Sequence, residues 1–377
     1  MNIWVAAGDS AGHLFPALAF LEAFAERFPQ GQVVLIASPQ ARRYLERCGN
    51  LRPQPAYELW QVEPFAFPGR PSWTWLVSLA RLSKSFGAVR RRMAAARPDL
   101  AVAFGGYLSV PVLWAARREG VPTLLHEQNA RWGRATRLAA RWADRIAVSF
   151  APQEARPDAR VVFTGNLIRR SIRERAAREA QKPRRSADTL TVGVLGGSQG
   201  SRSLNRLASR VLQKLLGEFG SLRVLHLSGD TDAELLRASA ASFNGRYEVM
   251  AWEGAPESFY SRLDFLIARA GSSCLAEAAL FGVPLVLVPY PHAGGHQEWN
   301  ARVFRDGGAA ELVAERGGDA EARLEQAVRT LLLDEERRLL AASCILRYGP
   351  SRAPERFLSE AIGLTRTQAH SEAMSHA

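Results

Sequence analysis

The sequence has few cysteines, no long apolar run and no residue spacing typical of a protein metal site. Its three cysteines, Cys48, Cys274 and Cys344, lie far apart among 377 residues, which excludes a disulfide framework and predicts a reducing cytoplasmic compartment. No stretch of about 18 apolar residues occurs, so we expect no membrane-spanning helix. The first residues lack the pattern of a signal peptide, and we predict neither a metal nor another cofactor.

Basic residues outnumber acidic ones, with 49 Lys and Arg against 37 Asp and Glu and a net charge of +12. This excess favours an anionic partner, which could be nucleic acid, an anionic membrane or a phosphorylated small molecule. A genome-wide preference for arginine is an alternative cause. Because no nucleic-acid-binding motif appears in its required context, we do not predict nucleic acid as a partner.

Short apolar segments alternate with helical stretches and fall into two sets. Their continuous hydrophobicity predicts parallel sheets that are covered on both faces. The charged segment 167–189 reads as a linker between two doubly wound α/β domains, at 1–166 and 190–349, which we expect to face each other across a cleft. The expected strands are 3–7, 33–36, 100–104, 123–125, 146–148 and 161–163, then 190–195, 223–227, 247–250, 265–268 and 285–288.

The end of the chain carries two further helical stretches, 321–343 and 354–362. We expect a C-terminal helix at about 350–364, and it could pack back on the first domain. A disordered tail is predicted for 365–377, because this stretch is polar.

Each domain begins with a strand that leads into a glycine loop, at Gly8–Gly12 and at Gly196–Gly200. A glycine turn that opens a helix presents free backbone N–H groups and the positive end of the helix dipole, which favours anions. The first loop is neither a Walker loop nor a clean GxGxxG. One such loop alone could be a packing turn, but two on different domains favour phosphate binding.

His13 stands in the first turn of the helix after the first loop, where the dipole favours a neutral imidazole that can act as a general base. The alternative is a histidine that caps or packs. The strand-end segment His126–Asn129 carries four polar groups, and we expect it to line a cleft because burial would be costly.

In the second domain, Gly271, Ser272 and Ser273 open a helix, and the Glu277 carboxylate could accept ribose hydroxyls. Its alternative is an ordinary solvated side chain. The loop 289–300 follows a strand, where ligands of such sheets bind, and Gln297 and Asn300 could pair with sugar hydroxyls.

Two other segments have competing interpretations. Asp230 and Asp232 form a DxD spacing, which we interpret as a loop and helix cap and not as a metal site. Residues 73–92 predict an amphipathic helix with basic flanks, suited to an anionic membrane surface. Its alternative is packing against its own sheet. The predicted membrane-facing residues are Trp73, Trp75, Leu79, Leu82 and Phe86.

Together these motifs resemble the MurG-type UDP-N-acetylglucosamine transferases. The matching segments run in family order: 8–19, 104–107, 126–129, 165–166, 196–205, 269–277 and 296–300. The resemblance implies a GT-B fold and inverting, metal-independent transfer of GlcNAc from UDP-GlcNAc to the C4 hydroxyl of undecaprenyl-diphospho-N-acetylmuramoyl-pentapeptide. It also implies peripheral attachment to the cytoplasmic face of the inner membrane.

The same resemblance assigns roles to individual residues. His13, Tyr107 and Glu127 become the catalytic and acceptor-side candidates. The family's first loop usually reads GGTGGH, so Asp9 and Ala11 depart from it, and Leu167 replaces a usual proline. The implied UDP-GlcNAc residues are Ser10, Ala11, Gly12, Asn129, Arg169, Ser198, Glu253, Ser272, Ser273, Cys274, Leu275, Ala276, Glu277 and Gln297.

Two related activities stay open at this point. A glycosyltransferase of the same superfamily could use diacylglycerol as acceptor. A non-hydrolysing UDP-GlcNAc 2-epimerase shares the fold and needs no lipid.

Overall fold

The computed structural model describes residues 1–8, 10–47, 57–62, 74–151, 158–181, 189–291 and 295–375. The chain forms two compact units, unit 1 with residues 1–169 and 352–377 and unit 2 with residues 170–351. The boundary differs from the expected linker, because Arg170–Glu179 forms helix α6 and belongs to unit 2. Ile172 and Ala176 give α6 a buried stripe, which is too narrow to stand out in a charged sequence.

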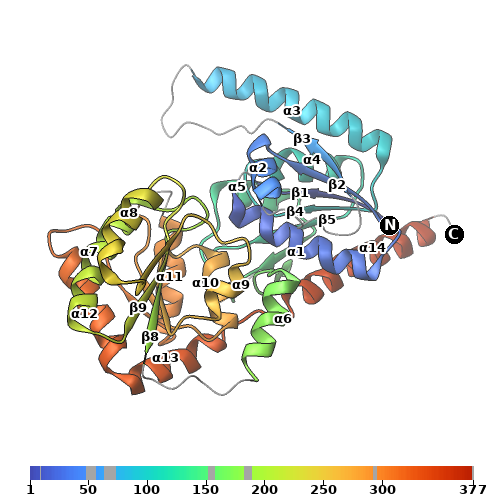
Figure 1. Cartoon of the computed structure of the whole chain (residues 1–377). Helices are drawn as coiled ribbons and strands as arrows, with labels where there is room; N and C mark the ends of the chain where they lie inside the picture. Colours follow the sequence, from blue (N-terminus) through green and yellow to red (C-terminus); the bar gives the residue numbers. More distant parts are fainter. Residues whose placement is uncertain are drawn as a thin grey trace. The chain divides into compact units, whose positions relative to one another are not determined.

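Unit 1 is built on a seven-stranded, fully parallel sheet (Figure 1). Its strand order is β3-β2-β1-β4-β5-β6-β7. The sequence missed β3, whose residues are partly exposed at the sheet edge and therefore lack a continuous apolar run. The strands are β1 (Asn2–Ala6), β2 (Gln32–Ala37), β3 (Tyr57–Gln61), β4 (Leu100–Ala103), β5 (Thr123–Glu127), β6 (Arg145–Val148) and β7 (Val161–Phe163).

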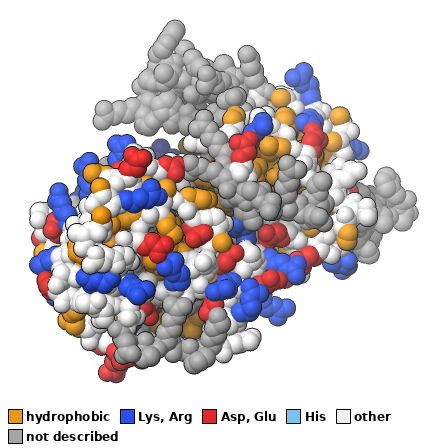
Figure 2. All heavy atoms as spheres, viewed as in Figure 1, with side chains coloured by type: hydrophobic (Ala, Val, Ile, Leu, Met, Phe, Trp, Pro, Cys, Tyr) orange, Lys and Arg blue, Asp and Glu red, His pale blue; other side chains and the backbone are white. Residues whose placement is uncertain are grey.

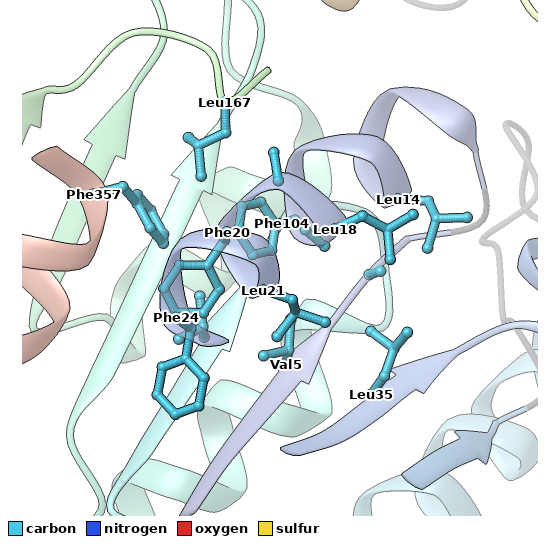
Figure 3. Packing of buried hydrophobic residues seen from close by; sticks show 14 of the residues in the cluster. Val5, Leu14, Leu18, Phe20, Leu21, Phe24, Leu35, Phe104, Leu167 and Phe357 are labelled. Carbon is cyan, nitrogen blue, oxygen red and sulfur yellow. The ribbon is translucent and has the colours of Figure 1, made fainter. Parts of the chain in front are cut away.

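Helices cover both faces of this sheet. Three aromatic rings form a cluster with centroids 5.2–6.0 Å apart (Figure 3): Phe20 of α1, Phe104 directly after β4, and Phe357 of α14. The C-terminal helix therefore supplies part of the unit 1 core. Trp4, Met93 and Leu113 lie in a second cluster, to which α3 and α4 contribute. The helices are α1 (Ala11–Arg27), α2 (Pro39–Arg47), α3 (Thr74–Ala96), α4 (Ser109–Arg118), α5 (Arg134–Ala139), the 3-10 helix η1 (Ala140–Trp142) and α14 (Ala353–Ser375).

The prediction of a disordered tail was wrong for residues 365–375, because α14 continues to Ser375. Residues 365–375 contain no proline or glycine and include good helix formers such as Ala, Glu, Gln and Met. Polarity alone therefore did not decide their conformation.

Unit 2 repeats the same architecture with six parallel strands in the order β10-β9-β8-β11-β12-β13. The sequence missed the three-residue edge strand β13. The expected helix 321–343 divides at Asp334, whose carboxylate accepts a hydrogen bond from Arg337 N at 2.8 Å and caps a new helix. The strands are β8 (Leu190–Leu195), β9 (Leu222–Leu227), β10 (Tyr247–Met250), β11 (Phe265–Ala268), β12 (Leu285–Leu287) and β13 (Ala310–Leu312).

Helices also flank the unit 2 sheet (Figure 1). Helix α6 contacts α9 and α10, which fixes its place in this unit. The others are α7 (Arg202–Glu218), α8 (Ala233–Ala240), the 3-10 helix η2 (Ala241–Phe243), α9 (Pro256–Tyr260), α10 (Ser272–Leu280), α11 (His296–Asp306), α12 (Ala320–Leu333) and α13 (Glu335–Leu346).

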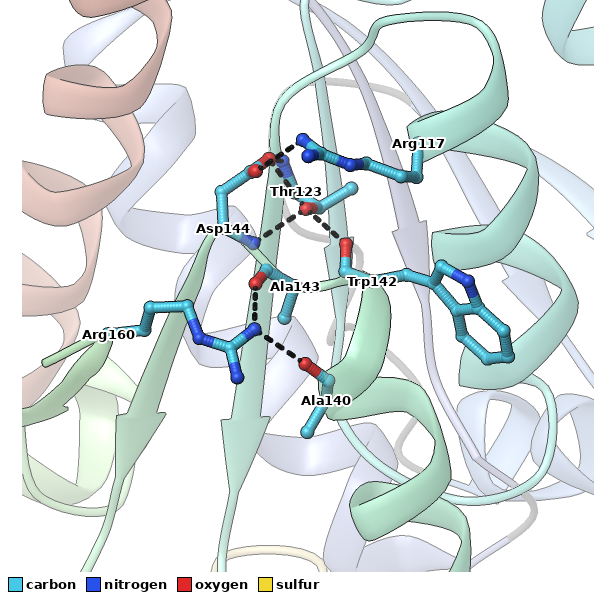
Figure 4. A network of polar contacts seen from close by, with 7 residues as sticks. All are labelled: Arg117, Thr123, Ala140, Trp142, Ala143, Asp144 and Arg160. Carbon is cyan, nitrogen blue, oxygen red and sulfur yellow. Dashed lines mark hydrogen bonds and ion pairs between the residues drawn. The ribbon is translucent and has the colours of Figure 1, made fainter. Parts of the chain in front are cut away.

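Polar contacts fasten the amino ends of strands in unit 1 (Figure 4). Asp144 Oδ2 accepts hydrogen bonds from Thr123 N at 2.9 Å and Thr123 Oγ1 at 2.8 Å, and Arg117 pairs with the same carboxylate. Arg160 Nη1 donates to the carbonyls of Ala140 and Ala143. We assign this network to stability, because ligands of such sheets bind at the opposite edge, beyond the carboxyl ends.

Each sheet has a point where consecutive crossovers leave in opposite directions, between β1 and β4 in unit 1 and between β8 and β11 in unit 2. This switch point is the usual ligand site of doubly wound sheets. In each unit the segments that follow these two strands carry the glycine and polar motifs noted in the sequence. Among the described helices, none is both long and apolar enough to cross a membrane.

Candidate functional site

At the unit 1 switch point, glycines make room for an imidazole. A Cβ added to Gly8 would lie 2.4 Å from His13 Nδ1, and one added to Gly105 would lie 3.1 Å from His13 Cδ2 and Nε2. Gly105 and Gly106 also have φ values of +78° and +72°, which favour glycine. The half-buried His13 ring therefore rests on three glycines that come from the ends of β1 and β4.

Ser10 directs this imidazole. It is the N-cap residue of α1, yet its side chain makes no capping hydrogen bond, and its Oγ lies 3.1 Å from His13 Nδ1. Ala11 is buried, and a Cβ on Gly12 would meet only Ser10 Oγ, at 3.7 Å. The sequence departure at Asp9 lies outside the described residues.

The expectation that His126–Asn129 lines a cleft was wrong for its first three residues. His126, Glu127 and Gln128 are at most 2% exposed. Gln128 Nε2 lies 3.0 Å from His126 Nδ1 and donates to Phe104 O. Burial lowers the pKa of His126 to about 4, so this ring is neutral near pH 7.

Glu127 holds the loop that presents Asn129. Its Oε1 accepts from Asn129 N at 2.9 Å and from Asn129 Nδ2 at 3.0 Å, and its Oε2 accepts from Gly133 N at 3.2 Å. The half-buried Asn129 follows directly. Glu127 thus fixes the loop backbone.

Tyr107 is also half-buried, and it follows Gly105 and Gly106 just before α4.

Buried polar atoms without a protein partner occur at the same edge of unit 1. Within the described residues, Gln128 Oε1, both amide atoms of Asn166 and Arg169 Nε have none. Such atoms are rare in folded proteins and indicate a place for water or ligand. The Arg169 guanidinium lies 5.0 Å from the Phe15 ring centroid. The sequence gave Asn166 no role, although it stands in a matching segment.

In unit 2 the second glycine loop is held by a close backbone approach. A Cβ on Gly200, whose φ is +75°, would lie 2.1 Å from Ser228 O. The next residue, Ser201, is the N-cap of α7, but its side chain does not cap the helix. The half-buried Ser198 lies within the loop. The start of α7 therefore has no capping oxygen from Ser201.

The helix after β11 also begins without a side-chain cap. Gly271 is the N-cap of α10, and Ser273 Oγ is buried without a partner among the described residues. Ser272, Leu275 and Ala276 are buried, so they can contribute mainly through backbone. Because β8 pairs with β11, two uncapped helix N-termini follow neighbouring strands.

Tyr260 supports the candidate ribose carboxylate. Its buried hydroxyl hydrogen-bonds with Glu277 and Cys274, and burial raises its pKa well above the ordinary value. Burial likewise raises the pKa of the Cys274 thiol to about 12, so Cys274 is a protonated thiol at neutral pH. Cys274 is therefore no nucleophile here, and Glu277 is positioned from α9.

Arg269, at the end of β11, links several segments of this site. Its side chain is 4% exposed and forms a bidentate pair with Glu315, with N–O distances of 2.8 and 2.9 Å. It also donates to Ser201 Oγ, Ser203 Oγ and Val288 O. Arg269 belongs to the matching segment 269–277, but the sequence did not predict this network.

The loop after β12 is organised by its own polar groups. Gln297 Oε1 accepts from Tyr290 N at 2.9 Å. Asn300 is fully buried and donates to Ala270 O at 3.0 Å, so the interpretation of Asn300 as a sugar ligand was wrong. Glu253 Oε1 accepts from Ala255 N at 2.9 Å.

A side chain of α7 engages the second aspartate of the DxD spacing. Asp232 is the N-cap residue of α8, but its carboxylate accepts from Asn205 Nδ2 at 2.7 Å and does not cap the helix. Within the described part of the chain, no three or more His, Cys, Asp and Glu side chains group as metal ligands would.

The predicted membrane-facing residues are only partly described. Trp73 lies outside the described residues, and Trp75, Leu79 and Leu82 belong to α3 without a description of their side chains. The Phe86 ring is half-buried and 4.9 Å from Trp114, so it packs within unit 1 and not on a free face. In the face shown in Figure 2, basic side chains are interspersed with acidic ones.

Comparison with known proteins identifies relatives over nearly the whole chain. Family models match the glycosyltransferase family 28 N-terminal domain over residues 3–148 and its C-terminal domain over residues 191–347. A Geobacter sulfurreducens protein is 31% identical over 98% of this chain and all of its own length. It is named UDP-N-acetylglucosamine–N-acetylmuramyl-(pentapeptide) pyrophosphoryl-undecaprenol N-acetylglucosamine transferase.

Solved structures agree with these sequence matches. MurG of Acinetobacter baumannii superposes with a TM-score of 0.73 at 25% identity, covering 96% of this chain and 99% of that one. The UDP-GlcNAc 2-epimerase of Neisseria meningitidis gives 0.69 at 11% identity, covering 96% and 100%, which shows a shared fold alone. The predicted GT-B fold of two Rossmann-like domains is thereby confirmed.

Proposed function

The chain belongs to glycosyltransferase family 28, and we propose that it transfers GlcNAc from UDP-GlcNAc to undecaprenyl-diphospho-N-acetylmuramoyl-pentapeptide. Its relatives are named for this reaction. The observation that carries the proposal is the pair of uncapped helix N-termini, α7 and α10, after neighbouring strands of unit 2. Such ends bind phosphate through backbone N–H groups and the helix dipole.

We assign donor binding to unit 2. As UDP leaves, negative charge grows on its diphosphate, and the N-termini of α7 and α10 with Ser198, Ser272 and Ser273 would stabilise it. Helix dipoles and N–H donors supply this stabilisation without a metal. The segment 274–276 contributes through its backbone, Glu277 binds the ribose, and Glu253 marks the uracil position.

We assign acceptor binding to unit 1, with His13 as the general base. If Nδ1–H donates to Ser10 Oγ, the Nε2 lone pair can take the proton of the attacking C4 hydroxyl. That hydroxyl attacks the anomeric carbon, the bond to UDP breaks, and the configuration inverts. Tyr107 contacts the acceptor in this scheme.

Other residues of the proposed site orient the sugar or neutralise the charge of the diphosphate. Glu127 acts by holding Asn129, which with Gln297 would bind GlcNAc hydroxyls. Arg169 supplies positive charge for the diphosphate, and Ser10, Ala11 and Gly12 line the first loop. Asn129 is half-buried at a strand end, where ligands of this fold bind.

A lipid-linked acceptor requires access to a membrane surface. We propose peripheral attachment to the cytoplasmic face of the inner membrane through the amino-terminal part of α3 and its basic flanks. Phe86 is not part of this surface, because it packs against Trp114. Vesicles with and without anionic lipid, combined with Leu79→Glu, test the attachment, and equal binding of both proteins would refute it.

An assay with labelled UDP-GlcNAc and lipid-linked muramoyl-pentapeptide tests the reaction. Transfer should occur with and without a chelator, and His13→Ala should lower turnover about 100-fold or more while UDP affinity stays near wild type. Equal, small losses in both would remove His13 from the base role. Transfer to diacylglycerol, or epimer formation from the donor alone, would instead support the alternative activities.

A further inference from the structure

The buried guanidinium of Arg269 reaches from the end of β11 to the start of α7. Its Nε and Nη2 both donate to Ser201 Oγ, at 3.1 and 2.8 Å, and Nη2 also donates to Ser203 Oγ at 2.8 Å. Nη1 donates to Val288 O at 2.9 Å. A single side chain thus connects the segments after β8, β11 and β12.

These hydrogen bonds change what Ser201 does. A serine at an N-cap normally accepts a hydrogen bond from an N–H in the first turn of its helix. The Ser201 side chain makes no such bond and accepts from Arg269 instead. The first-turn N–H groups of α7 therefore keep their capacity to bind an outside acceptor.

Because Glu315 pairs with Arg269, the role of Arg269 is to hold its neighbours in place and not to supply positive charge. The two side chains form two parallel hydrogen bonds, and their exposed fractions are 4% and 15%. The pair is close to neutral as a whole, and the planar fork fixes the guanidinium in one orientation. A lysine has no such fork and would not hold both serines.

We propose that Arg269, held by Glu315, is a positioning residue that withholds Ser201 from α7 and so keeps the start of α7 open for the diphosphate of the donor. This inference rests on the proposed function, because it assumes that the diphosphate binds at α7. Arg269 itself makes no contact with the ligand in this scheme.

The test uses the full chain with Arg269→Met and Glu315→Leu together, because either change alone would leave a buried charge unpaired. Binding of UDP is measured by calorimetry and binding of uridine by ligand-observed NMR. The double variant should bind UDP at least tenfold more weakly than wild type does. Its affinity for uridine, which has no phosphate, should stay within twofold of the wild-type value. Adding Ser201→Ala to this double variant should recover at least threefold, because the competing hydroxyl is gone.

Arg338→Met is the matched control. Arg338 is also a buried arginine of unit 2, but its Nη1 donates to Leu331 O at 2.7 Å, at the end of α12. This variant should melt at a lower temperature and bind UDP as wild type does. Parallel weakening of UDP and uridine, unchanged UDP binding, or no recovery with Ser201→Ala would each overturn the proposal. Failure of the wild-type chain to bind UDP would instead refute the proposed function.

Discussion

The first six strands of unit 1 and the six strands of unit 2 follow the same order, but the two units fill their switch points differently. In unit 1 the half-buried imidazole of His13 rests on Gly8, Gly105 and Gly106. In unit 2 the corresponding place holds the buried ion pair of Arg269 and Glu315. Under the proposed function, the first arrangement would serve proton transfer and the second would keep the start of α7 open for an anion, so the same fold would serve two kinds of chemistry.

The comparison extends to the serine at the start of the helix that follows the central strand, β1 in unit 1 and β8 in unit 2. Ser10 of α1 and Ser201 of α7 are both N-cap residues that do not cap their own helix. Ser10 Oγ contacts His13, and Ser201 Oγ accepts from Arg269. In both units a residue type that usually caps its own helix contacts instead a side chain at the switch point.

The largest expected effect breaks the unit 2 arrangement. In Gly200→Ala the new Cβ would lie 2.1 Å from Ser228 O at a φ of +75°, so the backbone must shift and the start of α7 moves with it. We expect UDP affinity to fall about 100-fold, measured by calorimetry, with a loss of stability of about 3 kcal/mol.

Gly197→Ala is the control in the same loop. Its φ is +92°, but a Cβ there meets nothing within 4 Å, so it carries only the conformational cost of about 1 kcal/mol. An equal loss of UDP affinity in both variants would show that φ, and not the close approach to Ser228, shapes the loop.

Both sheets and most of their strands could be predicted from the sequence, because buried parallel strands are continuously apolar. The edge strands β3 and β13 could not, since the first is partly exposed and the second has three residues. Glycine loops likewise marked the two switch points in advance. Tertiary contacts then decided what the pattern left open, as with α6, which is fixed by α9 and α10.

Within the site, the sequence located the motifs but did not predict which of their side chains are buried or what they bond to. Glu127 and Asn300 read as ligand-binding groups, yet both are buried and bonded to nearby backbone. Arg269 and Glu315 are 46 residues apart, and no local spacing links them. Polar residue types at strand ends are readable, whereas their long-range partners depend on the folded chain.

The second prediction uses the buried neutral histidine that each unit contains. Burial lowers the pKa of His126 and of His226 to about 4, against an ordinary value of 6.5. Between pH 6.5 and pH 4 the histidine is protonated in the unfolded chain but stays neutral in the folded unit. The free energy of unfolding is therefore unaffected by this histidine above pH 6.5, and it falls as the pH decreases from 6.5 toward 4. The loss is about 3 kcal/mol for each unit.

Chemical denaturation at several pH values between 7 and 4 measures this dependence. His126→Gln should reduce the pH dependence of unit 1, and His226→Gln that of unit 2. Each glutamine is uncharged at every pH, so the free energy of unfolding of each variant serves as the baseline against which the pH dependence of the wild type is compared. An unchanged slope in either variant would assign the acid sensitivity to other groups.

The third prediction displaces the unit 1 imidazole without removing it. The Cβ of Gly8→Ala would lie 2.4 Å from His13 Nδ1 and 3.1 Å from Gly105 O, so the ring must move. Turnover should fall about 30-fold, because small misplacements of a catalytic group are costly, whereas UDP affinity should stay within twofold. Gly217→Ala, where a Cβ meets nothing within 4 Å, is the control and should leave both unchanged.

The smallest expected effect comes from Ser10→Ala. Because Ser10 does not cap α1, its loss should cost a few tenths of a kcal/mol, below the roughly 1 kcal/mol typical of a capping serine. Its hydroxyl does contact His13 Nδ1 at 3.1 Å, so turnover should fall several-fold and the pH profile of kcat should shift. A normal capping loss with an unchanged pH profile would mean that Ser10 serves the helix, and the parallel with Ser201 would then fail.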